Sequence, residues 1–177
     1  MCDKSLYDNF LINLDKKISK YNDLHKDSIC CRKGCSHCCE KGDYPISEVE
    51  LEYLMLGYSR LNYDMRIKIQ DNVKILEKGG ACPFLLENCC AVYKYRPIIC
   101  RTHGLAYLNK NNVVVVPYCT SEGKNYSTLY SKGIFSGEPI RENLSTDFLL
   151  KDFRADKDFI IKPLYDWIKE DAEKVEK

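Results

Sequence analysis

The chain has 177 residues, 45% of them apolar, and its 27 Lys and Arg residues nearly balance its 26 Asp and Glu residues. This length and composition suit one hydrophobic core, so we expect a single domain over residues 1–177. A nucleic-acid-binding domain usually carries a basic surplus, so the net charge of +1 argues against nucleic acid as a partner. No apolar run approaches the roughly 20 residues that a spanning helix needs, which argues against a membrane partner.

The first predicted element is a helix over residues 4–21. Apolar side chains recur there at spacings of three and four, which places them on one face: Leu6, Phe10, Leu14, Ile18 and Tyr21. Residues 30–39, called the cysteine knuckle below, follow as a loop in which Gly34 permits a tight bend. Ser47 and Glu50 have capping-box spacing, which predicts that a helix begins there and runs to about Gly57.

The remaining elements are mostly helical. Residues 64–78 predict a helix ended by Gly79 and Gly80, and residues 147–153 and 163–173 predict two more, with Leu164 and Trp167 in the core. Residues 104–108 and 113–116 predict a β-hairpin around a polar link, and residues 120–145 predict a loop. The predicted fold class is mostly α within α+β: helices, one β-hairpin and cysteine-bearing loops.

Eleven cysteines are the most informative feature of the chain. Five fall within the knuckle, four of them in the nine residues 31–39, and the full set is Cys2, Cys30, Cys31, Cys35, Cys38, Cys39, Cys82, Cys89, Cys90, Cys100 and Cys119. The first residues show no basic segment followed by an apolar core, so we expect a cytoplasmic protein whose thiols stay reduced. Clustered cysteines then bind metal more often than they form disulfides, and an odd count leaves at least one thiol unpaired. Metal or iron–sulfur ligation is therefore preferred over disulfides and catalytic thiols.

The spacings between the cysteines indicate how they could bind metal. Two residues separate Cys35 from Cys38, so a bend can direct both thiolates at one ion. Adjacent side chains such as Cys38 and Cys39 usually diverge, so either the knuckle serves two metals or one of the pair packs in the core. The later cysteines, Cys82, Cys90, Cys100 and Cys119, are far apart in sequence, so the fold must bring them together and a bound metal would join their segments.

Three residues near Cys100 are candidates for binding the cofactor. Four thiolates around Zn²⁺ or around a [4Fe–4S]²⁺ cluster leave a charge of −2, which the guanidinium groups of Arg96 and Arg101 would offset. The alternative is that both arginines form ordinary carboxylate pairs. His103 could ligate, relay a proton or donate to a sulfur, and His37 could ligate or face solvent; a purely structural role remains the simpler interpretation for both.

The spacing Cys31-x3-Cys35-x2-Cys38 also matches the triad with which radical SAM enzymes hold an iron–sulfur cluster. That triad normally follows the first strand of a partial barrel of alternating strands and helices. Here the triad follows a predicted helix, and the chain shows no run of βα units. The context therefore argues against radical SAM chemistry.

Taken together, these residues resemble the YkgJ-like CxxCxxCC cysteine-cluster family of zinc- or iron-chelating proteins. Besides the knuckle, the resemblance rests on Cys82-Pro83-Phe84-Leu85, Cys90-Ala91-Val92-Tyr93 and Arg96-Pro97-Ile98-Ile99-Cys100-Arg101. Cys119 looks like the family's further downstream cysteine. The resemblance covers residues 31–119 and implies metal or iron–sulfur binding within a motif core of about 30–120. It implies little about a reaction.

The resemblance leaves two points open. The first gap has three residues where the family label has two, so either Cys30 or Cys31 could be the first ligand. Cys2, Cys30 and Cys89 lie outside the motif and are expected to be spare thiols. A similar cysteine pattern occurs in the flagellin lysine N-methylase, which keeps protein modification open as an activity.

The sequence therefore predicts a protein that binds zinc or an iron–sulfur cluster, in one or two centres. The predicted ligands are Cys31, Cys35, Cys38, Cys39, Cys82, Cys90, Cys100 and Cys119. Three functional classes stay open: a redox or protein-modifying enzyme, a non-catalytic binding module held together by metal, and a metal carrier. The expected partners are the metal ion and, for the first two classes, a protein substrate or partner.

Overall fold

The structure, a computed structural model, describes residues 4–175 and divides into two compact units. Unit 1 comprises residues 1–32 and 101–158, and unit 2 comprises residues 33–100 and 159–177. Cys2, predicted to be a spare thiol, lies outside the described residues. The single domain stays a prediction, and each unit is described by itself below.

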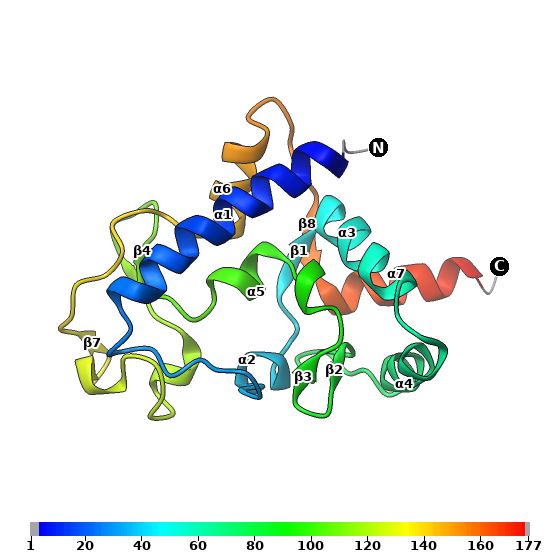
Figure 1. Cartoon of the computed structure of the whole chain (residues 1–177), viewed down its shortest axis with the longest axis horizontal. Coiled ribbons are helices and arrows are strands. Elements are labelled where there is room, and N and C mark those ends of the chain that lie inside the picture. The colour runs from blue at the N-terminus through cyan, green and yellow to red at the C-terminus, as the bar shows by residue number, and fades with distance from the viewer. Residues whose placement is uncertain (1–3, 176–177) are drawn as a thin grey trace. The chain divides into compact units, whose positions relative to one another are not determined.

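Unit 2 combines helices with two short strand pairs (Figure 1). Its elements are α2 (His37–Glu40), β1 (Pro45–Ser47), α3 (Glu48–Ser59), α4 (Tyr63–Lys74), β2 (Leu85–Leu86), β3 (Cys89–Cys90), the 3-10 turn η1 (Tyr93–Tyr95), the first residues of α5 (Ile98–Thr102), β8 (Ile161–Pro163) and α7 (Leu164–Val175). β1 pairs with β8 and β2 pairs with β3, both antiparallel.

The core of unit 2 lies between these elements. Its buried residues are Ile46, Leu54, Ile69, Phe84, Val92 and Leu164. Trp167 packs against this core, as predicted, and its indole N–H donates to the Ile46 carbonyl at 2.9 Å. Cys82 and Cys90 pack against the same core. Two of the predicted ligands therefore pack against the hydrophobic core of unit 2.

The helix boundaries in unit 2 follow local signals to different degrees. The capping box is confirmed: the Ser47 side chain accepts from the Glu50 N–H, and the Glu50 carboxylate accepts from the Ser47 N–H. The helix predicted over residues 64–78 ends at Lys74 instead. Ile75 is 78% exposed, so one further turn would bury little apolar surface, and the Gly79-Gly80 stop signal comes four residues too late.

Unit 1 contains one long helix and several short elements (Figure 1). They are α1 (Lys4–Leu24), the last residues of α5, β4 (Tyr107–Leu108), β5 (Val114–Val115), the 3-10 turns η2 (Tyr118–Thr120) and η3 (Ser127–Leu129), β6 (Tyr130–Ser131), β7 (Ile134–Phe135) and α6 (Thr146–Phe153). The helix predicted over 4–21 is confirmed, but Tyr7 and Leu11 are buried where Leu6 was expected, since Leu6 is 47% exposed. The Tyr7 ring packs against the Phe153 ring of α6, with the two ring centroids 5.2 Å apart.

The predicted hairpin is present as β4 and β5, which pair antiparallel with Tyr107 opposite Val115. The loop predicted over residues 120–145 is wrong in part, because β6 and β7 form a hairpin within it. Lys132 and Gly133 join these strands with φ of +51° and +80°, which is the conformation of tight hairpin turns. The α+β class is confirmed, with four short strand pairs rather than one among the described residues. Within residues 4–175, every helix is too short or too polar to cross a membrane.

Candidate metal centre

The knuckle is not entirely a loop, because Cys38 and Cys39 lie on the single turn α2. Gly34 makes the predicted bend with φ of +89°, and the amides of Cys39 and Glu40 both donate to the Ser36 carbonyl. The Sγ atoms of Cys38 and Cys39 are 3.9 Å apart. Zn–S bonds of about 2.3 Å put tetrahedral thiolates about 3.8 Å apart, so the adjacent thiols do not diverge as expected.

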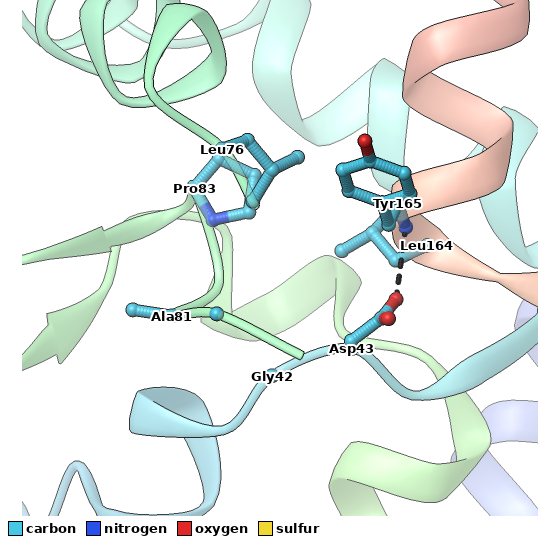
Figure 2. A pocket seen from close by; sticks show the side chains of 8 residues that line it. Gly42, Asp43, Leu76, Ala81, Pro83, Leu164 and Tyr165 are labelled. Carbon is cyan, nitrogen blue, oxygen red and sulfur yellow. Dashed lines mark hydrogen bonds between the residues drawn. The ribbon is translucent and has the colours of Figure 1, made fainter. Parts of the chain in front are cut away.

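Cys82 is held beside α2 by a close approach of two backbones. The Cys82 N–H donates to the Cys39 carbonyl at 2.7 Å, and the Gly42 N–H donates to the Gly80 carbonyl at 3.0 Å. A Cβ on Gly42 would lie 2.5 Å from the Cβ of Cys82, so only glycine fits there. Figure 2 shows the Gly42 segment next to the Ala81 segment, with Asp43 accepting from the Tyr165 N–H. Gly42, Asp43 and Ala81 line part of a pocket of about 10 Å³, which has room for about one water molecule.

Cys90 and Cys100 come from β3 and α5. Cys90 is opposite Leu85 in the β2–β3 pair, and the next amide, that of Ala91, donates to the Phe84 carbonyl at 2.9 Å. Glu50 is 1% exposed and accepts from the Ile98 N–H at 2.7 Å, which anchors the start of α5 to the capping box of α3. Both cysteines are therefore positioned by hydrogen bonds that neighbouring backbone amides donate to other segments of unit 2.

Five thiols of unit 2 interact electrostatically with one another, and we call them the unit 2 cysteine cluster: Cys38, Cys39, Cys82, Cys90 and Cys100. Burial, together with the charges of Cys90 and Cys38, raises the pKa of Cys82 to about 12. Burial and the neighbouring thiols likewise raise the pKa of Cys90 and of Cys100, although Cys100 keeps exposed surface. The cluster can thus hold several thiolates only beside a compensating cation.

The pKa values of the adjacent thiols Cys38 and Cys39 are shifted in opposite directions. The hydrogen bond from Cys39 lowers the pKa of Cys38 to about 7, and a protonated His37 acts in the same direction. The same hydrogen bond, with burial, raises the pKa of Cys39. One thiolate therefore forms readily in the cluster, while each further thiolate is opposed by its neighbours.

The cluster fits a zinc or iron centre by its chemistry. Thiolates are preferred ligands of both metals, and a cation among them would remove the mutual repulsion that raises their pKa values. Among residues 4–175, no three Cys, His, Asp or Glu side chains converge closely enough to enclose a metal ion as they stand. Metal binding would therefore require the thiols to turn towards one another on a backbone that already places them together.

The other predicted ligands are located differently. Cys31 and Cys119 belong to unit 1, where Cys31 is exposed and Cys119 is buried in η2. Asn125 contacts the thiols of both Cys30 and Cys31. Cys35 is half-buried just before α2 in unit 2, and Cys89, predicted to be spare, is exposed in β3.

Comparison with known proteins agrees with this arrangement of cysteines. A family model matches residues 30–120, half of the chain, and is described as "CxxCxxCC: Putative zinc- or iron-chelating domain". The chain belongs to the CxxCxxCC family. This assignment supports metal binding and confirms the predicted resemblance. No curated protein and no solved structure matches the chain.

Within this CxxCxxCC protein, the candidate cofactor-binding residues have different surroundings. Arg96 stacks on the Tyr93 ring with its guanidinium carbon 4.1 Å from the centroid, and its charge favours the thiolate of Cys90. The buried Arg101 guanidinium forms an ion pair with Asp15 at 2.5 Å, which is the ordinary carboxylate pairing considered as the alternative. Burial lowers the pKa of His103 to about 4, so its imidazole is neutral at physiological pH.

Three residues that position the cysteines escaped the sequence analysis as site residues. Gly42 belongs to none of the sequence motifs, although a glycine just after a ligand cluster can indicate a close backbone approach. Glu50 was recognised only as a helix cap, but it also holds the helix that carries Cys100. Asn125 lies 95 residues from Cys30, and no local pattern connects them.

Proposed function

We propose that the unit 2 cysteine cluster binds one zinc or iron centre that stabilises unit 2. The observation that carries this proposal is the origin of the thiols. Four separate segments, α2, the loop at Cys82, β3 and α5, bring five thiols into mutual electrostatic contact. A cysteine buried only for packing needs no thiol neighbours, so packing alone does not account for this arrangement.

Both metals suit the donor set. Zn²⁺ takes four thiolates, and a [4Fe–4S] cluster is also held by four, so the five thiols of unit 2 suffice for either. The positive charge of Arg96 favours the thiolate of Cys90, and it would offset part of the negative charge of a four-thiolate centre. Among the open classes, the family description names chelation and adds no support for redox or protein-modifying chemistry.

The proposal also favours a structural role over a carrier role. Cys82 and Cys90 contact the apolar core, so a metal bound to them would join core segments and contribute directly to the free energy of folding. A carrier, in contrast, gives up its metal while remaining folded. Chelation should therefore lower the unfolding temperature of the protein.

The test is metal analysis with a visible absorption spectrum on protein purified without air. We expect stoichiometric zinc in a colourless protein, or iron with acid-labile sulfide in a brown one. Cys82→Ser and Cys100→Ser should each lose the metal, whereas Cys89→Ser serves as the matched control because Cys89 is an exposed thiol beside the cluster. Full metal retention in both cluster variants, or metal-free wild-type protein that takes up neither zinc nor iron, would contradict the proposal.

A further inference from the structure

Asp43 connects three segments of unit 2, because each of its two carboxylate oxygens accepts a hydrogen bond from a different segment. Oδ2 accepts from the Gly79 N–H at 3.1 Å, in the turn just before Cys82. Oδ1 accepts from the Tyr165 N–H, also at 3.1 Å, in the first turn of α7 (Figure 2). Asp43 itself follows closely after Cys39, the last residue of the knuckle. The carboxylate therefore links the exit of the knuckle, the segment that leads to Cys82, and α7.

The contact to the turn before Cys82 extends a run of contacts that begins at the cysteines. The Cys82 N–H donates to the Cys39 carbonyl at 2.7 Å, and the Gly42 N–H donates to the Gly80 carbonyl at 3.0 Å. The carboxylate contact of Asp43 is the next one along these two segments, which therefore run antiparallel. A side chain thus completes the attachment that holds Cys82 beside α2.

The contact to α7 continues this attachment into the core. The Leu164 N–H donates to the Tyr44 carbonyl at 3.0 Å, next to the contact between α7 and Asp43. Leu164 is buried in the same core cluster as Phe84, and Cys82 packs against that cluster. A displacement of α7 at its first turn would therefore reach the segment that carries Cys82.

The two contacts of Asp43 require a carboxylate. Both partners are backbone N–H groups, so both side-chain oxygens must accept, and an ionised carboxylate offers acceptors without a donor. Asparagine has the same shape but only one acceptor, and its NH₂ group would oppose an N–H at the other position. Asparagine at this position would therefore lose one of the two contacts while filling the same space.

We infer that Asp43 is a positioning residue that pre-organises the unit 2 cysteine cluster for metal by holding Cys82 beside α2. The inference rests on the proposed metal-binding function and deepens it, because it gives a residue outside the predicted ligand set a share in the metal affinity. A protein whose binding-competent arrangement is only partly populated binds its ligand more weakly in the same proportion. Losing a contact of Asp43 therefore lowers metal affinity even when every thiol is present.

The test measures how readily a chromogenic chelator removes the bound zinc or iron from full-length protein purified without air. For Asp43→Asn we expect roughly 3- to 30-fold weaker metal binding, the range that the loss of one hydrogen bond corresponds to. Removing a negative charge would by itself favour a centre of thiolates, so the charge effect has the opposite sign and cannot imitate this loss. Asp43→Glu keeps the charge and both acceptor oxygens, so it should hold the metal more tightly than Asp43→Asn.

Asn62→Ala is the matched control for a purely structural effect. Asn62 accepts from the Met65 N–H at 2.9 Å at the start of α4, a helix of unit 2 that carries no cysteine. Both Asp43→Asn and Asn62→Ala should unfold at lower urea concentrations, but only Asp43→Asn should lose metal affinity beyond its loss of stability. Equal metal affinity in these two variants, or weaker binding in Asp43→Glu than in Asp43→Asn, would overturn the inference. Wild-type protein that binds neither zinc nor iron would instead overturn the proposed function, and this inference with it.

Discussion

Replacing Gly42 by Ala should weaken both unit 2 and its metal site. The added Cβ would lie 2.5 Å from the Cβ of Cys82 and 2.8 Å from its backbone nitrogen, whereas carbon atoms in ordinary contact are about 3.5–4.0 Å apart. These atoms of Cys82 are backbone or attached directly to it, so rotating a side chain cannot relieve the clash. The segment of Gly42 and the segment of Cys82 must therefore separate.

The separation has a calculable cost. It breaks two backbone hydrogen bonds, from Cys82 to Cys39 and from Gly42 to Gly80, each worth about 1 kcal/mol. Overpacking adds about 1–3 kcal/mol. We therefore expect a loss of about 3–5 kcal/mol in the free energy of unfolding, a large part of the roughly 5–15 kcal/mol of a typical domain. Because Cys82 moves away from α2, metal affinity should also fall.

The assay is urea unfolding combined with competition against a chromogenic zinc chelator. Gly57→Ala is the matched control, because its Cβ would lie 2.6 Å from the Tyr95 ring in the same unit and the three atoms nearest to it all belong to Tyr95. We expect both variants to lose stability. Only Gly42→Ala should lose more metal affinity than its loss of stability accounts for. If Gly42→Ala unfolds at the wild-type urea concentration, or if the two variants bind zinc equally well, the backbone-approach argument is wrong.

Three further predictions concern side chains around the cysteines. Glu50→Ala leaves the buried Ile98 N–H and the Ser47 hydroxyl without their acceptor, so urea unfolding should show a loss of at least about 3 kcal/mol, with Glu50→Gln in between. Arg96→Gln removes a charge that favours the Cys90 thiolate, so zinc affinity should fall by less than about fivefold and Arg96→Lys should restore it. The folded pKa of His103 lies near 4, below its usual 6.5, so the folded state binds fewer protons between these values and stability should fall as pH drops from 6.5 to 4, by up to roughly 3 kcal/mol. His103→Gln should remove this slope in pH-dependent urea unfolding, and an unchanged slope would show that another group causes it.

The sequence was sufficient where the determining contacts are local. The capping box of Ser47 and Glu50 involves residues three apart, and α1 repeats its apolar residues often enough to be recognised despite a one-residue error in its buried face. The end of α4 was wrong because burial, which the sequence does not display, decides whether Ile75 and the next residues stay helical.

The candidate site shows the same limit. Residue types and spacing were enough to select the five thiols that unit 2 brings together. Their mutual arrangement depends on contacts between distant segments, such as the hydrogen bond from Cys82 to Cys39 across 43 positions of the printed sequence. The proximity of Cys38 and Cys39 depends on a turn in which the Ser36 carbonyl accepts hydrogen bonds from two backbone amides. Nothing in the motif spacing specifies that turn.

The placement of these thiols links folding to the metal. Burial by itself already disfavours a negative charge on Cys82, and each thiolate that forms nearby makes the next deprotonation harder. Without metal, the cluster is therefore stable mainly as neutral thiols. Metal binding replaces their protons with one shared cation, which makes binding release protons and strengthens it as pH rises. Because Cys82 and Cys90 also pack against the core of unit 2, the free energy of metal binding at these thiols would also stabilise the fold. The proposed structural role therefore predicts a protein that retains its metal rather than delivering it.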